Sequence, residues 1–248
     1  GRPGLAIGAP KTKGINLGSS QHWADSIVAK YPHKIKSSND VADAVDVYRK
    51  MLSEQPFKSV TIITVGFLTN LANLLKSQPD NISPIGGKEL VIQKVKQLVA
   101  MAGKFPEGME FNVFMDSIAS DYVFKNWPGD IIFTGYEIGW EIRTGLRLMN
   151  SEVENSPVKD VFRISIPLSE EDKHGRMSWD ETAVLIGVYG TEGFFDTVRG
   201  KMIVNPDGSN TWEDNPEGKH VYVKQKMAVD RMSMFIEDRM MHQPIPIK

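Results

Sequence analysis

The chain has 248 residues, with 29 Lys and Arg against 31 Asp and Glu and a formal net charge of −2. This balance supplies no net basic field for nucleic acid or for an anionic membrane surface. The apolar runs are also far shorter than the roughly 18 residues of a membrane-spanning helix. The absence of cysteine excludes disulfide frameworks, thiolate nucleophiles and zinc–cysteine sites. We therefore expect a globular protein with no nucleic-acid partner and no membrane partner.

Strand and helix patterns alternate over the first half of the chain. The runs typical of strands buried on both faces are Val60–Val65, Gln97–Met101 and Asp130–Thr134. Helical spacing also predicts five helices. The first ends at Tyr31, with Ser19 or Ser20 as its N-cap, and the second runs from its N-cap Asp40 through Leu52. The other three lie over 69–76, over a segment whose last residues are 91–96, and over 117–125. This order predicts an α/β fold with a mostly parallel open sheet and helices on both faces.

The last third of the chain has a different pattern. It predicts a helix over 178–189, short antiparallel strands over 198–204, 211–213 and 220–226, and a closing helix over 228–241. No Pro- or Gly-rich linker divides the sequence. We therefore predict one α/β domain over 1–248, with a small antiparallel element near its C-terminus.

Two polar segments lie where an open α/β sheet binds ligands, at the carboxyl ends of its strands. Glu110 and Asn112 follow the second predicted strand, and in an extended loop both side chains would point to one side. A carboxylate beside an amide suits sugar hydroxyls, which both donate and accept. Local sequence alone favours a plainer interpretation: these residues cap the following helix with Asp116 as its N-cap, and Asp180 is an acid at a helix N-terminus.

Several motifs together resemble the inosine-uridine preferring nucleoside hydrolase family. Thr61–Ala72 contains a corner similar to the family's Gly-x-Leu-Thr-Asn element. Met101-Ala102-Gly103, followed by Glu110-Phe111-Asn112, is similar to its Met-Gly-Gly … Glu-Phe-Asn element, and Trp179-Asp180 looks like the start of its C-terminal metal-binding helix. The likeness runs in order over essentially the whole chain.

The resemblance implies a calcium-dependent N-glycosidase that acts on ribonucleosides with water as the attacking group. By position, the metal ligands would be the Val65 carbonyl and the Asp180 carboxylate. Met101, Glu110 and Asn112 match the residues that line and hold the ribose. The implied partner is a small-molecule nucleoside, and assembly into a homo-oligomer is left open.

The chain departs from the family at the metal. The family's Asp-x-Asp-x-x-x-Asp-Asp strand, which carries the general base and most of the metal charge, is not in this sequence, and no Asp-Asp pair occurs in it. We therefore expect the domain to be N-terminally incomplete. Calcium should bind weakly or not at all to these residues alone, because a divalent ion needs several hard oxygen ligands.

Two further positions are predicted catalytic residues. Trp179 stands where some relatives carry a His that protonates the leaving base, so stacking on an aromatic ring would take its place. His22 lies where relatives carry a His on a mobile loop near the substrate.

The sequence leaves two alternative functions open. Under the first alternative, the chain is a non-catalytic or truncated relative that binds a sugar or nucleoside. Under the second, it is a related glycoside hydrolase with a non-nucleoside substrate. The replacement at Trp179 and the short loop between Gly103 and Glu110 motivate the second alternative.

Overall fold

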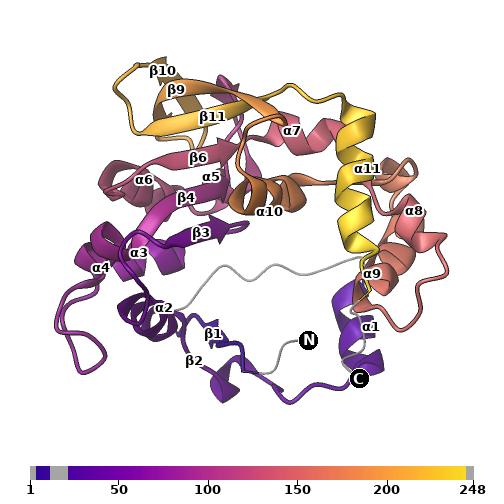
Figure 1. Cartoon of the computed structure of the whole chain (residues 1–248), viewed down its shortest axis with the longest axis horizontal. Coiled ribbons are helices and arrows are strands. Elements are labelled where there is room, and N and C mark those ends of the chain that lie inside the picture. Colours follow the sequence, from indigo (N-terminus) through magenta and orange to yellow (C-terminus); the bar gives the residue numbers. More distant parts are fainter. Residues whose placement is uncertain (1–3, 12–21, 244–248) are drawn as a thin grey trace.

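The computed structural model describes residues 4–11 and 22–243. Its central sheet contains β3 (Val60–Thr64), β4 (Val95–Met101), β5 (Glu107–Gly108), β6 (Ile131–Thr134), β9 (Phe195–Val204), β10 (Asn210–Asp214) and β11 (His220–Gln225). The seven strands lie in the order β3-β4-β6-β11-β9-β10-β5 (Figure 1). Each neighbouring pair from β3 to β11 is parallel, and the pairs from β11 to β5 are antiparallel. The predicted fold class is thereby confirmed.

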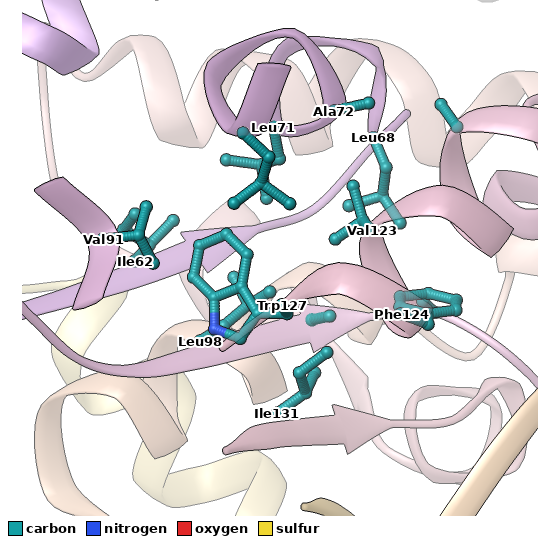
Figure 2. Packing of buried hydrophobic residues seen from close by; sticks show 14 of the residues in the cluster. Ile62, Leu68, Leu71, Ala72, Val91, Leu98, Val123, Phe124, Trp127 and Ile131 are labelled. Carbon is teal, nitrogen blue, oxygen red and sulfur yellow. The ribbon is translucent and has the colours of Figure 1, made fainter. Parts of the chain in front are cut away.

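Helices cover both faces of this sheet. One face packs against α2 (Ala44–Ser53), α3 (Thr69–Lys76), α4 (Gly87–Lys94) and α6 (Ser117–Asn126), and the other against α7 (Tyr136–Glu141), α10 (Trp179–Tyr189) and α11 (Val229–Met240). Successive strand residues alternate between the two cores, as a pleated strand requires: Leu98 joins the first and Val99 the second. Figure 2 shows the first core, with Leu71, Val123 and Trp127 gathered around Leu98 and Ile131.

The remaining elements surround the two ends of the sheet. They are β1 (Gly8–Ala9), α1 (Trp23–Lys30), β2 (Ala42–Asp43), α5 (Phe111–Met115), β7 (Arg143–Thr144), α8 (Leu146–Met149), α9 (Pro157–Ser165), β8 (Arg176–Met177) and three short 3-10 turns at Ser38–Asp40, Ile166–Leu168 and Glu170–Asp172. β1 pairs in parallel with β2, and α1 packs against α9 (Figure 1). Within the described ranges, no helix is long and apolar enough to cross a membrane.

Two predicted boundaries are wrong for identifiable reasons. The helix expected to run through Lys96 stops at Lys94, because Val95 already pairs with Val60 in the sheet. Asp40 does not cap α2; it closes the 3-10 turn, and Asp43 accepts the Val45 N–H at 2.7 Å instead. The other helices and strands lie close to their predicted ranges, and Ser19 and Ser20 fall outside the described residues.

A slot separates β1 from the edge of the central sheet. Among the described residues, β3 pairs only with β4 and β1 only with β2. A cavity of about 640 Å³ lies between them, lined by Gly8, by the segment 59–63 and by side chains of α2 such as Tyr48. An edge strand this rich in β-branched residues is an open hydrogen-bonding surface for a further strand.

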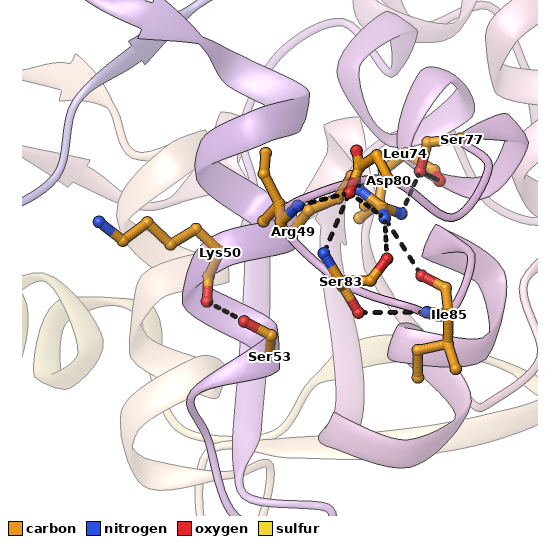
Figure 3. A network of polar contacts seen from close by, with 9 residues as sticks. Arg49, Lys50, Ser53, Leu74, Ser77, Asp80, Ser83 and Ile85 are labelled. Carbon is orange, nitrogen blue, oxygen red and sulfur yellow. Dashed lines mark hydrogen bonds and ion pairs between the residues drawn. The ribbon is translucent and has the colours of Figure 1, made fainter.

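One buried arginine organises the loop between α3 and α4 (Figure 3). Arg49 of α2 is 1% exposed, and its guanidinium donates to both carboxylate oxygens of Asp80, at 3.0 and 2.8 Å. It also donates to the Ser77 hydroxyl at 3.0 Å and to the carbonyls of Ser83 and Ile85 at 3.1 Å. The Arg49 hydrogen bonds hold the pKa of the Asp80 carboxyl below its usual value. The Arg49 side chain thus donates hydrogen bonds to four residues of this loop, which buries few apolar side chains of its own.

We predict that Arg49→Met lowers the free energy of unfolding by about 3 kcal/mol, because it leaves buried carbonyls and a carboxylate without their donor. Urea denaturation followed by circular dichroism measures the change. The matched control is Lys50→Met, the adjacent exposed position, which should change stability by no more than about 0.5 kcal/mol. Equal effects of the two substitutions would contradict the role assigned to Arg49.

Candidate active site

The carboxyl end of β4 brings Met101 and Asn112 into contact. Asn112 lies in the first turn of α5, and its Nδ2 donates to the Met101 carbonyl at 3.1 Å and lies 3.3 Å from the Met101 Sδ. The expected extended loop is therefore wrong, because α5 begins at Phe111. The two predicted ribose-binding residues are nevertheless adjacent, with an amide and a thioether facing the edge of the sheet.

Glu110 is the N-cap of α5, a short helix that the sequence pattern does not predict, whereas the plainer interpretation had it cap the helix at 117–125. Its carboxylate accepts the backbone N–H groups of Asn112 at 2.8 Å, Val113 at 3.1 Å and Gly103 at 3.1 Å, and the residue is 3% exposed. Burial raises the pKa of the Glu110 carboxyl, the three donors oppose this increase, and the charge of Asp180 adds to it. Glu110 therefore fixes the loop that carries Asn112, and its direct part in ribose binding stays a prediction.

Helix α10 delivers Asp180 to the same edge. Gly187, near the end of α10, lies against Ile63 of β3, while Trp179 at its start lies against Gly139 of α7, beyond the end of β6. The helix therefore runs antiparallel to the strands, and its N-terminal turn reaches their carboxyl ends. The side chain of Asp180 is exposed, yet desolvation by the surrounding protein raises the pKa of its carboxyl, and the nearby Arg176 opposes this increase.

Trp179 is held within an aromatic group. Its indole Nε1 donates to the Tyr136 carbonyl at 2.8 Å, and its ring centroid lies 5.5 Å from that of Tyr136 and 6.4 Å from that of Trp140. Gly139 permits this arrangement, because a Cβ at that position would overlap with the Trp179 ring and main chain. Since its N–H is already bonded, Trp179 offers a substrate an aromatic surface and no proton.

A cavity of about 210 Å³ lies between α1, α9 and the start of α10. Its lining includes Trp23, Phe162, Arg176, Trp179, Asp180 and Glu181. Sequence reasoning missed Trp23 and Glu181; the only local signal for Trp23 was its position next to His22. Burial raises the pKa of Glu181 from its ordinary value near 4.5 to about 7.

Within the described part of the chain, no hydrogen bond or ion pair joins the other two predicted site residues, His22 and Val65, to the site residues above. His22 precedes α1 and has a left-handed backbone conformation, with Nδ1 3.7 Å from a carboxylate oxygen of Asp25. Both side chains are largely exposed, and His22 does not line the cavity beside Trp23. Val65 directly follows β3, at the carboxyl edge, with a side chain that is 40% exposed. The roles of His22 and Val65 stay predictions.

The described residues do not form a complete calcium site. Within 4–11 and 22–243, no three His, Cys, Asp or Glu side chains are grouped so that they could hold a metal ion. Calcium takes six to eight oxygen ligands. Asp180 and the Val65 carbonyl supply two of these at most, so the donor set at this edge is insufficient for the ion that the resemblance implies.

Comparison with known proteins relates most of the chain to one family. Residues 6–234 match the family model described as "Inosine-uridine preferring nucleoside hydrolase". A protein of that name from Leishmania major is 27% identical over 125 residues, which cover 48% of this chain and 37% of that protein. The pyrimidine-specific ribonucleoside hydrolase RihA from Photobacterium profundum is 31% identical over 132 residues, 48% of this chain and 36% of that one. The chain thus matches less than half the length of these curated relatives.

Solved structures share the fold over most of the chain. A plant nucleoside hydrolase, the PpNRh1 enzyme, superposes with a TM-score of 0.68 at 19% identity, covering 92% of this chain and 76% of that one. An inosine-uridine preferring nucleoside hydrolase from Bacillus anthracis superposes with a TM-score of 0.67 at 16% identity, covering 97% and 81%. At these identities the likeness establishes the architecture.

We predict that Gly139→Ala displaces Trp179 and lowers the free energy of unfolding by about 2 kcal/mol, the usual cost of overpacking a fixed contact. Near-ultraviolet circular dichroism should lose aromatic signal from the Tyr136–Trp140–Trp179 group. Gly129→Ala is the control, because the nearest atom to its added Cβ lies 3.9 Å away. An unchanged aromatic spectrum in Gly139→Ala would refute the close approach.

We also predict a pH-dependent gain in stability from Glu181→Gln. The pKa of Glu181 is about 7 in the folded state, against an ordinary value of 4.5 in the unfolded chain. Between pH 4.5 and 7 this carboxyl is therefore ionised in the unfolded chain but protonated in the folded one, so the free energy of unfolding falls as pH rises through this range. The amide cannot ionise, so the variant should exceed the wild type by at least about 1 kcal/mol at pH 8 and match it near pH 4.5. Urea denaturation with a chelator present measures this, with the exposed Glu192→Gln as control. A gain that does not depend on pH would contradict the assignment.

Proposed function

The chain belongs to the inosine-uridine preferring nucleoside hydrolase family, and we propose that, together with a further acidic strand, it cleaves the N-glycosidic bond of ribonucleosides with water as the attacking group. The observation that carries the proposal is the meeting of Met101, Asn112 and Asp180 at one edge of the sheet. Asn112 contacts Met101 directly, and the charge of Asp180 acts on Glu110, the residue that positions Asn112. These relations support a shared site formed by three segments that are distant in sequence.

The chemistry of these groups suits a ribonucleoside. The Asn112 amide can both donate to and accept from ribose hydroxyls, and the Met101 thioether supplies an apolar wall. The Trp179 ring offers a surface on which a leaving base can stack. Cleavage of a glycosidic bond develops positive charge on the sugar, which the carboxylates of Asp180 and Glu110 would stabilise at close range.

We propose that calcium activation requires a further strand in the slot beside β3. A parallel strand in that slot would end at the same edge as Val65 and Asp180, and carboxylates on it would supply the missing ligands.

A second candidate function is binding without turnover. It is favoured by the insufficient donor set, because the described residues offer no group of three His, Cys, Asp or Glu side chains that could hold a cation. Under this alternative the chain binds a ribose or nucleoside at Asn112 and Met101 but does not hydrolyse it. The third possibility, a glycoside hydrolase with a non-nucleoside substrate, rests on Trp179 in place of a His.

The experiment is a ribose-release assay with inosine and uridine, with and without a chelator. We expect no hydrolysis by the 248-residue chain. We expect calcium-dependent hydrolysis by a chain that also carries an Asp-x-Asp-x-x-x-Asp-Asp strand upstream of Gly1. In that enzyme Asp180→Asn should lower kcat at least about 1000-fold, because the loss of one member of a catalytic unit removes most of the rate enhancement of the whole unit.

The control variant is Asp196→Asn, a surface position that pairs with Lys226. Full activity of the short chain, or activity of the long chain that a chelator does not affect, would refute the calcium mechanism. Nucleoside binding by both chains with hydrolysis by neither would favour the second candidate function.

A further inference from the structure

Helix α1 forms one wall of the cavity beside Asp180, yet its apolar contacts are weak. Trp23, which lines the cavity, is 39% exposed, and Val28 is 56% exposed. No residue of α1 is fully buried. Burial of apolar surface is the usual anchor of a short helix. The position of α1 must therefore depend substantially on polar contacts.

The strongest polar contact of α1 is to one buried carboxylate of α9. Asp160 is 6% exposed, and its Oδ2 accepts from the Lys30 ammonium and from the Tyr31 hydroxyl, the latter at 2.9 Å. Its Oδ1 accepts from Arg163 Nε at 3.2 Å, within α9 itself. The Lys30 hydrogen bond is the main reason that the pKa of Asp160 lies below its usual value.

This carboxylate joins two walls of the same cavity. Asp160 directly precedes Val161 and Phe162, which line the cavity from α9. Lys30 and Tyr31 lie at the C-terminal end of the helix that begins with Trp23. Figure 1 shows α1 beside α9, away from the central sheet, so the sheet does not hold α1 in place.

We propose that Asp160 is a positioning residue: through Lys30 and Tyr31 it holds α1 against α9 so that Trp23 closes the cavity beside Asp180, and it thereby sets how tightly substrate is retained. The part concerning α1 stands on the contacts alone. The part concerning substrate rests on the proposed function, with a ribonucleoside as the retained molecule.

The first test is hydrogen exchange of the 248-residue chain, measured by mass spectrometry. Asp160→Asn keeps the size of the side chain but places an amide beside Lys30, so the amides over 24–31 should exchange about tenfold faster. Exchange in β4 and β6 should change less than twofold. Tyr31→Phe, which removes one donor, should give a smaller increase of about threefold.

A lysine pair supplies the matched control. Lys30→Met should accelerate exchange over 24–31 as Asp160→Asn does, whereas Lys34→Met makes the same charge change four positions further along at an exposed site and should have no effect. Unchanged exchange in both Asp160→Asn and Lys30→Met would overturn the proposal. An increase spread evenly over α9 and the sheet would also overturn it, because that result describes a general loss of stability.

The second test uses the enzyme that carries the acidic upstream strand, with inosine as substrate. A wall present in both the ground state and the transition state contributes uniform binding, so Asp160→Asn should raise KM about tenfold and change kcat less than twofold. Trp23→Ala should raise KM similarly, and the double variant should show no additive effect, because both act through one wall.

The two tests separate the proposal from the proposed function. An unchanged KM together with faster exchange over 24–31 would overturn the substrate part and support the positioning of α1. If the enzyme neither binds nor hydrolyses nucleosides, the proposed function fails, and the exchange results still decide whether Asp160 holds α1.

Discussion

The parallel pairing of β3, β4 and β6 is the constraint on which the site depends. Parallel strands end at one edge, so the segments that leave β4 and β6 must begin their helices within reach of one another. α10 runs in the opposite direction across the same strands, which brings its acidic first turn to that edge. The common direction of the strands, more than any single contact, therefore puts Met101 and the first turn of α10 at the same edge of the sheet.

Capping then converts this general placement into specific geometry. Glu110 accepts three backbone N–H groups, one from Gly103 in the turn after β4 and two from α5. Because these bonds join the turn to the helix, Asn112 is carried back to Met101. The role of Glu110 as a cap and the placement of Asn112 are thus parts of one arrangement, and they were not competing interpretations.

The sequence predicts the elements well because their signals are local. The β-branched run at Val60–Val65 specifies its own backbone conformation, and β3 lies over Val60–Thr64 as predicted. Contacts made across long separations carry no such signal. Arg49 and Asp80 are 31 residues apart, and Lys30 and Asp160 are 130 apart. Neither pair, nor the place of Trp23 in the cavity, follows from spacing. Met101, Asn112 and Asp180 could be proposed together only because a family resemblance related these distant segments.

The electrostatics of this edge favour a reaction that develops positive charge. Desolvation by the surrounding protein raises the pKa of Glu110, Asp180 and Glu181, and the charge of Asp180 increases this shift at both of the other two. Carboxylates placed together in this way destabilise one another, and a fold keeps such an arrangement at a cost in stability. A cation, or a sugar that becomes cation-like as its glycosidic bond breaks, would remove that repulsion. The cost is therefore offset at the moment of bond cleavage, so the same charges that strain the resting site lower the barrier of the proposed reaction.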